Sequence, residues 1–338
     1  MDSSGEHRAN SAQFVESGIS CSSVVAFGQY PGLNMGMNAE SNDIVLSVRE
    51  VVVRFDRPDG SGSVTVLNGV TFDVYRGETI VIMGGSGCGK STLLNCLIGE
   101  IEPAEGEIIY HFPDLGDIDL AHADSKTADL LRKRFGILFQ SGALFSSMTV
   151  AENVALPLQE HSHIDKEVID IVVAMKLQQV HMLEHRDKKP AQLSGGQKKR
   201  AGLARATALD PEILYYDEPS AGLDPVTSTA IDQLMMDLSQ KLQVTSIVVT
   251  HEMDSAFRIA DRMVMLDQGR ILRVGTRQEF DEIRVLDPTR IEDREMKLIH
   301  QFLNGAATGP LTDVDGTSLY EKLLVHGEES SIFKSSSK

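Results

Sequence analysis

A glycine-rich loop at residues 84–91 constrains the fold of this 338-residue chain more than any other feature. It reads Gly-Gly-Ser-Gly-Cys-Gly-Lys-Ser and matches the phosphate-loop pattern GxxxxGK(S/T) at every position. The continuous apolar run 79–83 precedes the loop, and residues 91–98 have the pattern of a helix. A strand, a glycine loop and a helix in this order predict a site for the phosphates of a nucleotide.

The residue types in the loop indicate how it would hold phosphate. Glycines let consecutive backbone N–H groups turn toward the phosphates, and the following helix adds the positive end of its dipole. We expect Lys90 to reach the β- and γ-phosphates and the Ser91 hydroxyl to ligate Mg²⁺. The residues predicted to contact the nucleotide here are Gly84, Gly85, Ser86, Gly87, Cys88, Gly89, Lys90, Ser91 and Thr92.

The three cysteines, Cys21, Cys88 and Cys96, form no CxxC pair, which is typical of a chain in a reducing compartment. Cys88 lies inside the phosphate loop. A thiol there could act as a redox switch, but a small residue accommodated in a tight loop is the simpler interpretation.

A second apolar strand ends in two carboxylates. Residues 213–216 read Ile-Leu-Tyr-Tyr, and Asp217 and Glu218 follow directly. At the carboxyl edge of a sheet, Asp217 can hold Mg²⁺ through its water shell, while Glu218 can polarise the attacking water. An apolar run ending in Asp-Glu is often an ordinary strand end, but this one precedes the sequence Pro-Ser-Ala-Gly-Leu-Asp that ends at Asp224.

The rest of the pattern predicts an α/β fold with a P-loop NTPase core. Two alternating runs at 44–55 and 63–74 predict an antiparallel β subdomain at the start of the ordered chain. Strands and helices then alternate, which implies a parallel sheet flanked by helices. We expect strands at 213–216, 244–249 and 263–266, with helices at 227–242 and 253–260 between them.

Two intervening stretches carry weaker signals. Residues 100–135 look irregular and acidic, but the spacing of Asp114, Asp117, Asp119 and Asp124 does not reproduce a calcium loop, so we interpret them as a solvated insertion. Residues 164–180 predict an amphipathic helix whose apolar stripe is expected to be buried in the core. That stripe comprises Ile164, Val168, Ile171, Val172 and Met175.

Four further motifs occur in a fixed order along the chain. Residues 193–197 read Leu-Ser-Gly-Gly-Gln, Gln140 lies between the phosphate loop and this motif, Asp224 follows it, and His251 comes after the strand at 247–250. Together these residues resemble the signature, Q-loop, D-loop and H-loop of ATP-binding subunits of ABC transporters. The resemblance covers residues 44–276.

This resemblance implies an ATPase that works as a head-to-tail dimer with a second copy of itself. ATP and Mg²⁺ would lie between the phosphate loop of one subunit and the signature of the other, because the N–H groups at the start of the signature helix form an anion site. Glu218, His251, Gln140 and Lys90 would be catalytic, and Ser91, Gln140 and Asp217 would hold the metal. The remaining nucleotide contacts implied by the family are Ser194, Gly195, Gly196, Gln197 and Asp224.

The family also places an aromatic side chain against adenine, upstream of the phosphate loop. Phe55 ends an alternating strand at the matching position in the motif order, and we expect it to fill this role. Phe72 and Tyr75 are the alternatives that lie nearby in the sequence.

Other segments resemble the lipid-trafficking branch of the family, namely the bacterial maintenance-of-lipid-asymmetry ATPase and the chloroplast trigalactosyldiacylglycerol importer. They are residues 139–145, 148–158, 198–200, 216–225 and 301–310. The implied partners are an integral membrane permease, docked beside Gln140 and the 145–180 region, and a lipid-binding subunit of MCE type. The implied location is peripheral, on the cytoplasmic face of the inner (plasma) membrane.

We therefore divide the chain into a disordered leader at 1–42, a nucleotide-binding domain at 43–284 and a C-terminal extension at 285–338. A helical subdomain is expected at about 145–200. The leader is rich in Ser, Gly and Asn and fits neither a secretory signal nor an Arg-rich transit peptide. The segment 318–325 is apolar enough to clasp another ATPase, although a disordered tail fits its composition better.

Three other classes of ABC protein remain as alternatives. A soluble ATPase of DNA repair or translation usually carries two cassettes or a coiled coil and a basic surface, whereas this chain has one cassette and a net charge of −17. We therefore expect no nucleic acid partner. An importer of a small solute such as an amino acid would share every catalytic residue. A regulatory subunit that binds ATP without hydrolysing it is disfavoured, because Lys90, Asp217, Glu218 and His251 are all present.

No apolar run in the sequence approaches the ~20 residues that are needed to span a bilayer.

Overall fold

The computed structural model describes residues 43–57, 60–306, 310, 313–314 and 317–318. Two large sheets organise them, one antiparallel and one mostly parallel. Our predictions for the leader at 1–42 and for the segment 319–325 lie outside the described residues. Within the described part of the chain, no helix is both long and apolar enough to cross a membrane.

The first sheet has four antiparallel strands in the order β2-β1-β4-β5. The alternating runs expected at its start are both present, since Val53 and Leu67 are paired and buried on the inner face. Polar side chains occupy the outer face, as expected for a sheet with one face in water. The strands are β1 (Ile44–Asp56), β2 (Ser63–Tyr75), β4 (Glu105–Phe112) and β5 (Gly116–Asp119).

The second sheet has six strands in the order β10-β9-β3-β8-β7-β6. All neighbours are parallel except the edge pair β10 and β9, which is antiparallel. The predicted parallel sheet is thus confirmed, with one antiparallel strand added at its edge. The strands are β3 (Thr79–Met83), β6 (Phe135–Leu138), β7 (Ile213–Asp217), β8 (Thr245–Val249), β9 (Arg262–Asp267) and β10 (Arg270–Thr276).

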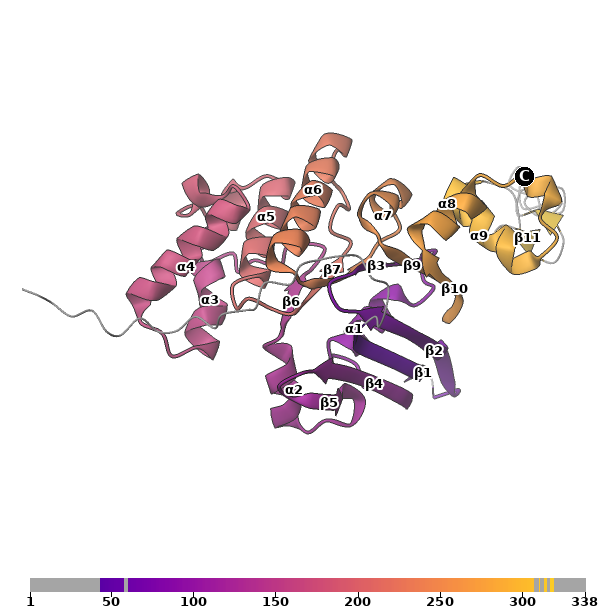
Figure 1. Cartoon of the computed structure of the whole chain (residues 1–338), viewed down its shortest axis with the longest axis horizontal. Coiled ribbons are helices and arrows are strands. Elements are labelled where there is room, and N and C mark those ends of the chain that lie inside the picture. The colour runs from indigo at the N-terminus through magenta and orange to yellow at the C-terminus, as the bar shows by residue number, and fades with distance from the viewer. Residues whose placement is uncertain (1–42, 58–59, 307–309, 311–312, 315–316, 319–338) are drawn as a thin grey trace, which may run out of the picture. The chain divides into compact units, whose positions relative to one another are not determined.

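Helices cover both faces of the parallel sheet. Figure 1 shows α1 on the side of the antiparallel sheet, and α5, α6 and α7 on the opposite side. The helices are α1 (Lys90–Leu97), α2 (Ser125–Arg132), α3 (Val150–His161), α4 (Lys166–Gln179), α5 (Gly195–Ala206), α6 (Pro225–Leu242), α7 (Met253–Ile259), α8 (Arg277–Arg284) and α9 (Arg294–Asn304). Short 3-10 turns lie at Leu120–His122, Leu183–His185, Pro190–Gln192 and Pro288–Arg290, and a two-residue hairpin pairs Asp313–Val314 with Thr317–Ser318.

The alternation of side chains along β3 divides the interior into two cores. Ile80 and Ile82 point into the core shared with α1 and the antiparallel sheet, whereas Val81 and Met83 point into the core shared with α3 to α9. Successive side chains of a strand face opposite sides, so a continuous apolar strand is the pattern of a sheet buried on both faces. The phosphate loop that follows β3 is therefore anchored between two packed layers.

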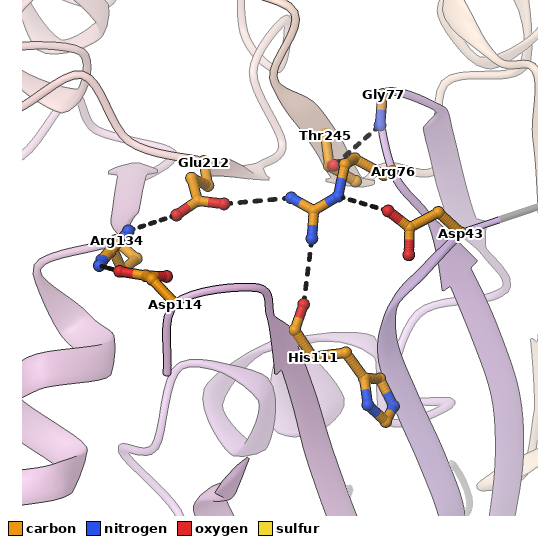
Figure 2. Close-up of polar contacts among 8 residues, drawn as sticks. All are labelled: Asp43, Arg76, Gly77, His111, Asp114, Arg134, Glu212 and Thr245. Carbon is orange, nitrogen blue, oxygen red and sulfur yellow. Dashed lines mark hydrogen bonds and ion pairs between the residues drawn. The ribbon is translucent and has the colours of Figure 1, made fainter. Parts of the chain in front are cut away.

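A polar cluster ties the antiparallel sheet to the amino-terminal edge of the parallel sheet (Figure 2). Arg76 donates to Asp43 at 3.0 Å, to Glu212 at 3.1 Å and to the backbone carbonyl of His111 at 3.1 Å. Glu212 also accepts from Arg134 at 2.5 Å, and Arg134 in turn bonds Asp114. One carboxylate thus joins two arginines from different parts of the sequence.

The prediction of an irregular insertion at 100–135 is wrong, because β4, β5 and α2 all lie within it. Its acidic residues have local partners that fix regular structure. Asp124 caps α2 by accepting from the Thr127 backbone N–H at 2.8 Å, and Asp119 accepts from the backbone N–H of Ile108 on the neighbouring strand at 3.0 Å. These charges mark the exposed side of short elements, and the sequence pattern was therefore mistaken for a loop.

The predicted burial of the apolar stripe on residues 164–180 is also wrong. Ile171 is 61% exposed and Met175 is 58% exposed, while the buried side of α4 carries Ile169, Val173 and Leu177. Ile164 and Val168 are exposed as well, and only Val172 of the predicted stripe packs partly against the core. The helix itself is present, but it has apolar residues on two sides, and periodicity does not say which side the protein covers.

Candidate functional site

The predicted catalytic residues follow four neighbouring strands of the parallel sheet. The phosphate loop follows β3, His251 follows β8, Asp217 ends β7 and Gln140 follows β6, and these strands are adjacent in the order β3-β8-β7-β6. The register places both Ile82 and Asp217 beside Val249. Since the carboxyl ends of parallel strands meet at one edge, residues far apart in sequence converge there.

Glycine is required in the phosphate loop by close contacts as well as by backbone torsion. A Cβ on Gly84 would lie 2.1 Å from the Leu266 carbonyl oxygen, and one on Gly89 would lie 2.7 Å from Leu67 Cδ2. Gly89 also has a φ of 108°, a region that L residues rarely adopt. The loop is therefore wedged against β9 and β2 and can hold its N–H groups in fixed positions.

Lys90 is almost buried at 9% exposure and lies across the loop. Its Nζ donates to the carbonyl oxygens of Gly84 at 2.8 Å and Gly85 at 3.0 Å. An ammonium on a flexible stem can exchange these acceptors for phosphate oxygens without a change in the backbone. The lysine thus already lies where an anion held by the loop would meet it.

Cys88 is buried, with a relative exposure of 5%. Burial raises the pKa of its thiol above the ordinary value, although the Lys90 charge acts in the opposite direction. Its backbone carbonyl accepts from the Gly269 N–H at 3.0 Å. A buried protonated thiol reacts poorly with oxidants, so these contacts favour the structural interpretation of Cys88.

Asp217 and Glu218 lie side by side with different surroundings. Burial raises the pKa of Asp217, the neighbouring Glu218 charge raises it further, and Lys199 and Lys90 lower it. The Glu218 side chain is 13% exposed, and its two carboxylate oxygens accept from the Thr250 hydroxyl at 3.3 Å and pair with His251 Nδ1 at 2.8 Å. Glu218 is thus a mostly buried carboxylate held on the cavity wall, a position that is compatible with a general base.

A cavity of about 1180 Å³ joins these residues. The predicted site residues that line it are Gly84, Gly85, Ser86, Gly87, Lys90, Ser91, Gln140, Asp217, Glu218 and His251.

Gln140 is exposed, at the start of the segment that leads to α3. Ser91, Gln140 and Asp217 offer hydroxyl, amide and carboxylate oxygens, the donors that Mg²⁺ prefers beside phosphate. Among the described residues, no cluster of three His, Cys, Asp or Glu could hold a metal. The oxygen donors of Ser91, Gln140 and Asp217 are chemically suited to a Mg²⁺ ion.

Other residues of the cavity wall were not predicted. Phe302 and Gly305, at the end of α9, line the same cavity, as do Arg258 and Arg284. Phe302 and Gly305 lie in the segment 301–310 that resembles the lipid-trafficking branch, but nothing in the sequence places them at the site, because they meet it only through the packing of α7, α8 and α9. Lys199 lies in the segment 198–200 of the same resemblance, and its burial behind the site was not predicted.

The signature residues are not among those that line the cavity. Ser194 caps α5 in a reciprocal capping box, in which the Gln197 N–H donates to the Ser194 hydroxyl at 3.3 Å and the Ser194 N–H donates to the Gln197 side chain at 2.9 Å. Ser194 and Gly195 are exposed, whereas Gly196 is buried against Thr227. The helix start therefore faces outward, away from its own phosphate loop.

Asp224 begins α6 and accepts from the Thr227 N–H at 3.0 Å and from the Thr227 hydroxyl at 2.6 Å. Hydrogen bonds from Thr227 hold the pKa of this carboxyl below its usual value. Leu223 and Pro225, on either side, line the cavity. The segment is thus a rigid capped turn between the site and the exposed side chain of Val226, which is 80% exposed.

Of the three aromatic candidates, only Phe55 presents an open ring. It is 43% exposed and pairs with Val64 on β2. Phe72 is buried in the core at 4% exposure, and the Tyr75 ring is covered by the Arg262 guanidinium at 4.6 Å. A stacking role for Phe55 stays a prediction, and the surroundings of Phe72 and Tyr75 disfavour both.

Comparison with known proteins finds one family model, ABC transporter, that matches residues 67–221. The chain is 36% identical over 265 residues to the intermembrane phospholipid transport system ATP-binding protein MlaF of Escherichia coli K12, spanning 78% of this chain and 93% of that protein. It is 38% identical over 250 residues to the probable ribonucleotide transport ATP-binding protein mkl of Mycobacterium leprae, spanning 74% of this chain and 67% of that protein.

Solved structures give the same result for the fold. The dimeric ATP-binding cassette MJ0796, solved in a post-hydrolysis state with ADP and Pi, is 30% identical with a TM-score of 0.61 and covers 68% of this chain and 98% of its own. The protein cbiO1 of Clostridium perfringens, part of a cbiONQ transporter complex, is 30% identical with a TM-score of 0.62 and covers 73% and 97%. The predicted α/β cassette is confirmed.

Proposed function

This chain belongs to the ABC transporter family of ATP-binding subunits and is an ATPase, and we propose that it drives the movement of phospholipid through a separate membrane permease. The observation that carries the proposal is the 36% identity to a phospholipid transport ATP-binding protein across 93% of that protein's length. The alignment therefore extends over nearly the whole relative and is not limited to the nucleotide motifs. We place the chain peripherally on the cytoplasmic face of the inner membrane.

The residues at the sheet edge fit hydrolysis of the γ-phosphate. The loop N–H groups and Lys90 would bind the phosphates and stabilise the charge that develops on them. Glu218 would accept the proton of the attacking water, and His251, bonded to it, would contact the γ-phosphate. A Mg²⁺ ion held by Ser91, Asp217 and Gln140 would neutralise phosphate charge. Each group lies on the cavity that the phosphate loop opens into.

We propose that two copies share each ATP in a head-to-tail dimer. The outward position of Ser194 supports this arrangement, because an exposed helix start is an anion site, and Ser194 does not line the cavity of its own subunit. The dimeric state of the cassette MJ0796 supports it as well. Closure of two such shared sites would move the helical regions of both subunits toward each other.

An apolar surface on the helical region is suited to the permease. Phe145, near Gln140, is 52% exposed, and Ile171 and Met175 on α4 are 61% and 58% exposed. Contiguous apolar surface marks interaction sites, and we propose that these three side chains belong to one such surface. A lipid-binding subunit of MCE type would then complete the transporter on the other side of the permease.

Affinity purification of the tagged chain from native membranes tests the cargo. We expect a permease to co-purify, together with phospholipid that can be extracted and identified by mass spectrometry. Recovery of a permease for ribonucleotides, amino acids or other small solutes without bound lipid would overturn the lipid assignment while leaving the ATPase intact.

A further inference from the structure

Lys199 is a buried lysine directly behind the catalytic carboxylates. It is 4% exposed, and its Nζ donates to the backbone carbonyl of Glu218 at 2.8 Å. Burial lowers the pKa of its ammonium to about 8, against the charges of Asp217, Glu218 and Glu252, which raise it. Burying a lysine costs free energy unless its ammonium is hydrogen bonded, so this contact offsets part of the cost of burying Lys199.

The peptide that Lys199 holds has an unusual conformation. Glu218 has a φ of 48°, in the left-handed region that a side-chain-bearing residue rarely adopts. Strained residues of this kind persist only where the surroundings fix them, and they gather at active sites. The Glu218 N–H donates to the Val249 carbonyl at 2.9 Å, so the backbone of Glu218 is held by β8 through its N–H and by Lys199 through its carbonyl.

Lys199 belongs to the helix that begins at the signature. Ser194, at the start of α5, is exposed, while Lys199 lies inside, one turn further along the same helix. The far end of α5 holds the segment after Gln140, since Arg205 donates to the Ala143 carbonyl at 2.7 Å. A single rigid helix therefore touches the signature face, the Glu218 peptide and the Gln140 segment.

We propose that Lys199 is a positioning residue for hydrolysis, which carries the state of the signature end of α5 to the Glu218 carboxylate of the same subunit. Because the signature would face the partner's ATP, occupancy of one shared site sets the position of the base in the other. The inference rests on the proposed base role of Glu218 and on the proposed head-to-tail dimer. It adds a direct link between the two sites through one side chain.

The chain offers a matched control in Lys176 on α4. Lys176 is also buried, at 5% exposure, and pairs with Asp210, and neither residue lines the nucleotide cavity. Lys199→Met and Lys176→Met thus each remove one buried ammonium and keep the length of the side chain. Only the first removes a bond to the catalytic peptide.

The test measures ATP hydrolysis by the full-length chain purified with its membrane partners. For Lys199→Met we expect kcat to fall about 10- to 100-fold, as for a base displaced by a fraction of an ångström to an ångström, with the KM for ATP changed less than about twofold. The Hill coefficient for ATP should fall toward one. Lys199→Arg, which keeps a charged donor, should recover part of kcat, and Lys176→Met should keep both kcat and the Hill coefficient.

Two results would overturn the inference. One is a wild-type kcat and Hill coefficient in Lys199→Met, and the other is an equal loss in Lys176→Met, which would show a general effect of removing a buried lysine. If Lys199→Met does not fold, Lys199→Gln takes its place, with the same expected loss of cooperativity. A parallel Glu218→Gln variant distinguishes failure of the Lys199 inference from failure of the proposed base role of Glu218. Full hydrolysis in that variant would refute the base role, whatever the result for Lys199.

Discussion

His251 Nδ1 lies 2.8 Å from Glu218 Oε1, and this contact joins the ends of two neighbouring strands, β8 and β7. The two partners differ in exposure, since the histidine side chain is 59% exposed and the glutamate side chain 13%. The exposed imidazole of His251, at the rim of the cavity, therefore orients the carboxylate of Glu218, which lies deeper in the cavity wall. The carboxylate keeps its position through Thr250, while the ring can turn toward a phosphate.

Replacement of Glu218 by Gln should stop hydrolysis and keep ATP binding. The amide preserves the shape and the contact with Thr250, but it cannot accept the proton of the attacking water. Loss of a general base typically costs about 10²- to 10⁴-fold in rate. We expect ATP to trap a stable dimer of this variant, visible as a shift in size-exclusion chromatography, and hydrolysis at the wild-type rate would contradict the base assignment.

Ser194→Arg tests whether the sites are shared. The bulky cation at the start of α5 would block the anion site on one subunit while leaving that subunit's own phosphate loop intact. In mixtures with wild type, each mixed dimer should keep one intact site, formed by the variant's phosphate loop and the wild-type signature, so the specific activity should fall in proportion to the fraction of the variant. Unchanged specific activity in such mixtures would argue against shared sites. Lys198→Arg, on the same helix, serves as a control for added bulk.

Much of the site could be predicted because the fold brings strand ends together. Lys90, Asp217 and His251 each follow an apolar strand, and parallel strands deliver their carboxyl ends to one edge. The sequence order of these residues therefore carried enough information to group them. In the antiparallel start, alternation predicts the buried side for β2, where Val70, Phe72 and Val74 alternate with less buried residues, but not for β1, where residues 45–48 and 51–53 are all buried.

What could not be predicted depends on contacts between distant elements. Lys199 meets Glu218 only because α5 packs against the parallel sheet at β6, and no local pattern separates it from its half-buried neighbour Lys198. On α4, Ile171 and Val173 are equally apolar, yet one is 61% exposed and the other 1%. Hydrophobic periodicity identifies the helix, while the choice of buried side is made by the neighbours α3 and α5.

Ile171→Glu should leave the fold unchanged and weaken association with the permease. Substitution of an exposed residue usually changes the free energy of unfolding by less than about 0.5 kcal/mol. Val173→Glu is the matched control on the buried side, where an unpaired charge should cost about 3–5 kcal/mol. Thermal unfolding distinguishes the two, and co-purification from membranes measures the association. Full recovery of the permease with Ile171→Glu would remove α4 from the docking surface.

Glu212→Ala should destabilise the protein by about 1–3 kcal/mol, because it leaves both Arg76 and Arg134 without their shared acceptor. The cluster in Figure 2 is half-buried, and the arginines cannot both regain full hydration. Asp129→Ala is the comparison, since its pair with Arg132 is exposed and worth at most about 1 kcal/mol. Urea unfolding measures both, and equal effects would show that the cluster adds nothing beyond a surface pair.

The capping box of α8 predicts a stability change with pH. Glu279 accepts from the Thr276 backbone N–H at 2.6 Å and from its hydroxyl at 3.0 Å, and these bonds hold the pKa of its carboxyl below the ordinary value of 4.5. A carboxyl whose pKa is lower in the folded state stabilises the fold above the unfolded value, and this contribution is lost as pH falls through the folded value.

Glu279→Gln should therefore be less stable than wild type at pH 7, and the difference should shrink as the pH falls below about 4.5, the ordinary pKa of the carboxyl. Glutamine keeps a capping oxygen, so the difference reports the charge and not the loss of the cap. Glu282→Gln, on the same helix but outside the cap, should show a smaller difference at pH 7. Melting curves between pH 3 and 7 provide the measurement. A difference for Glu279→Gln that stays constant over this range would mean that the cap does not depend on the ionised carboxylate.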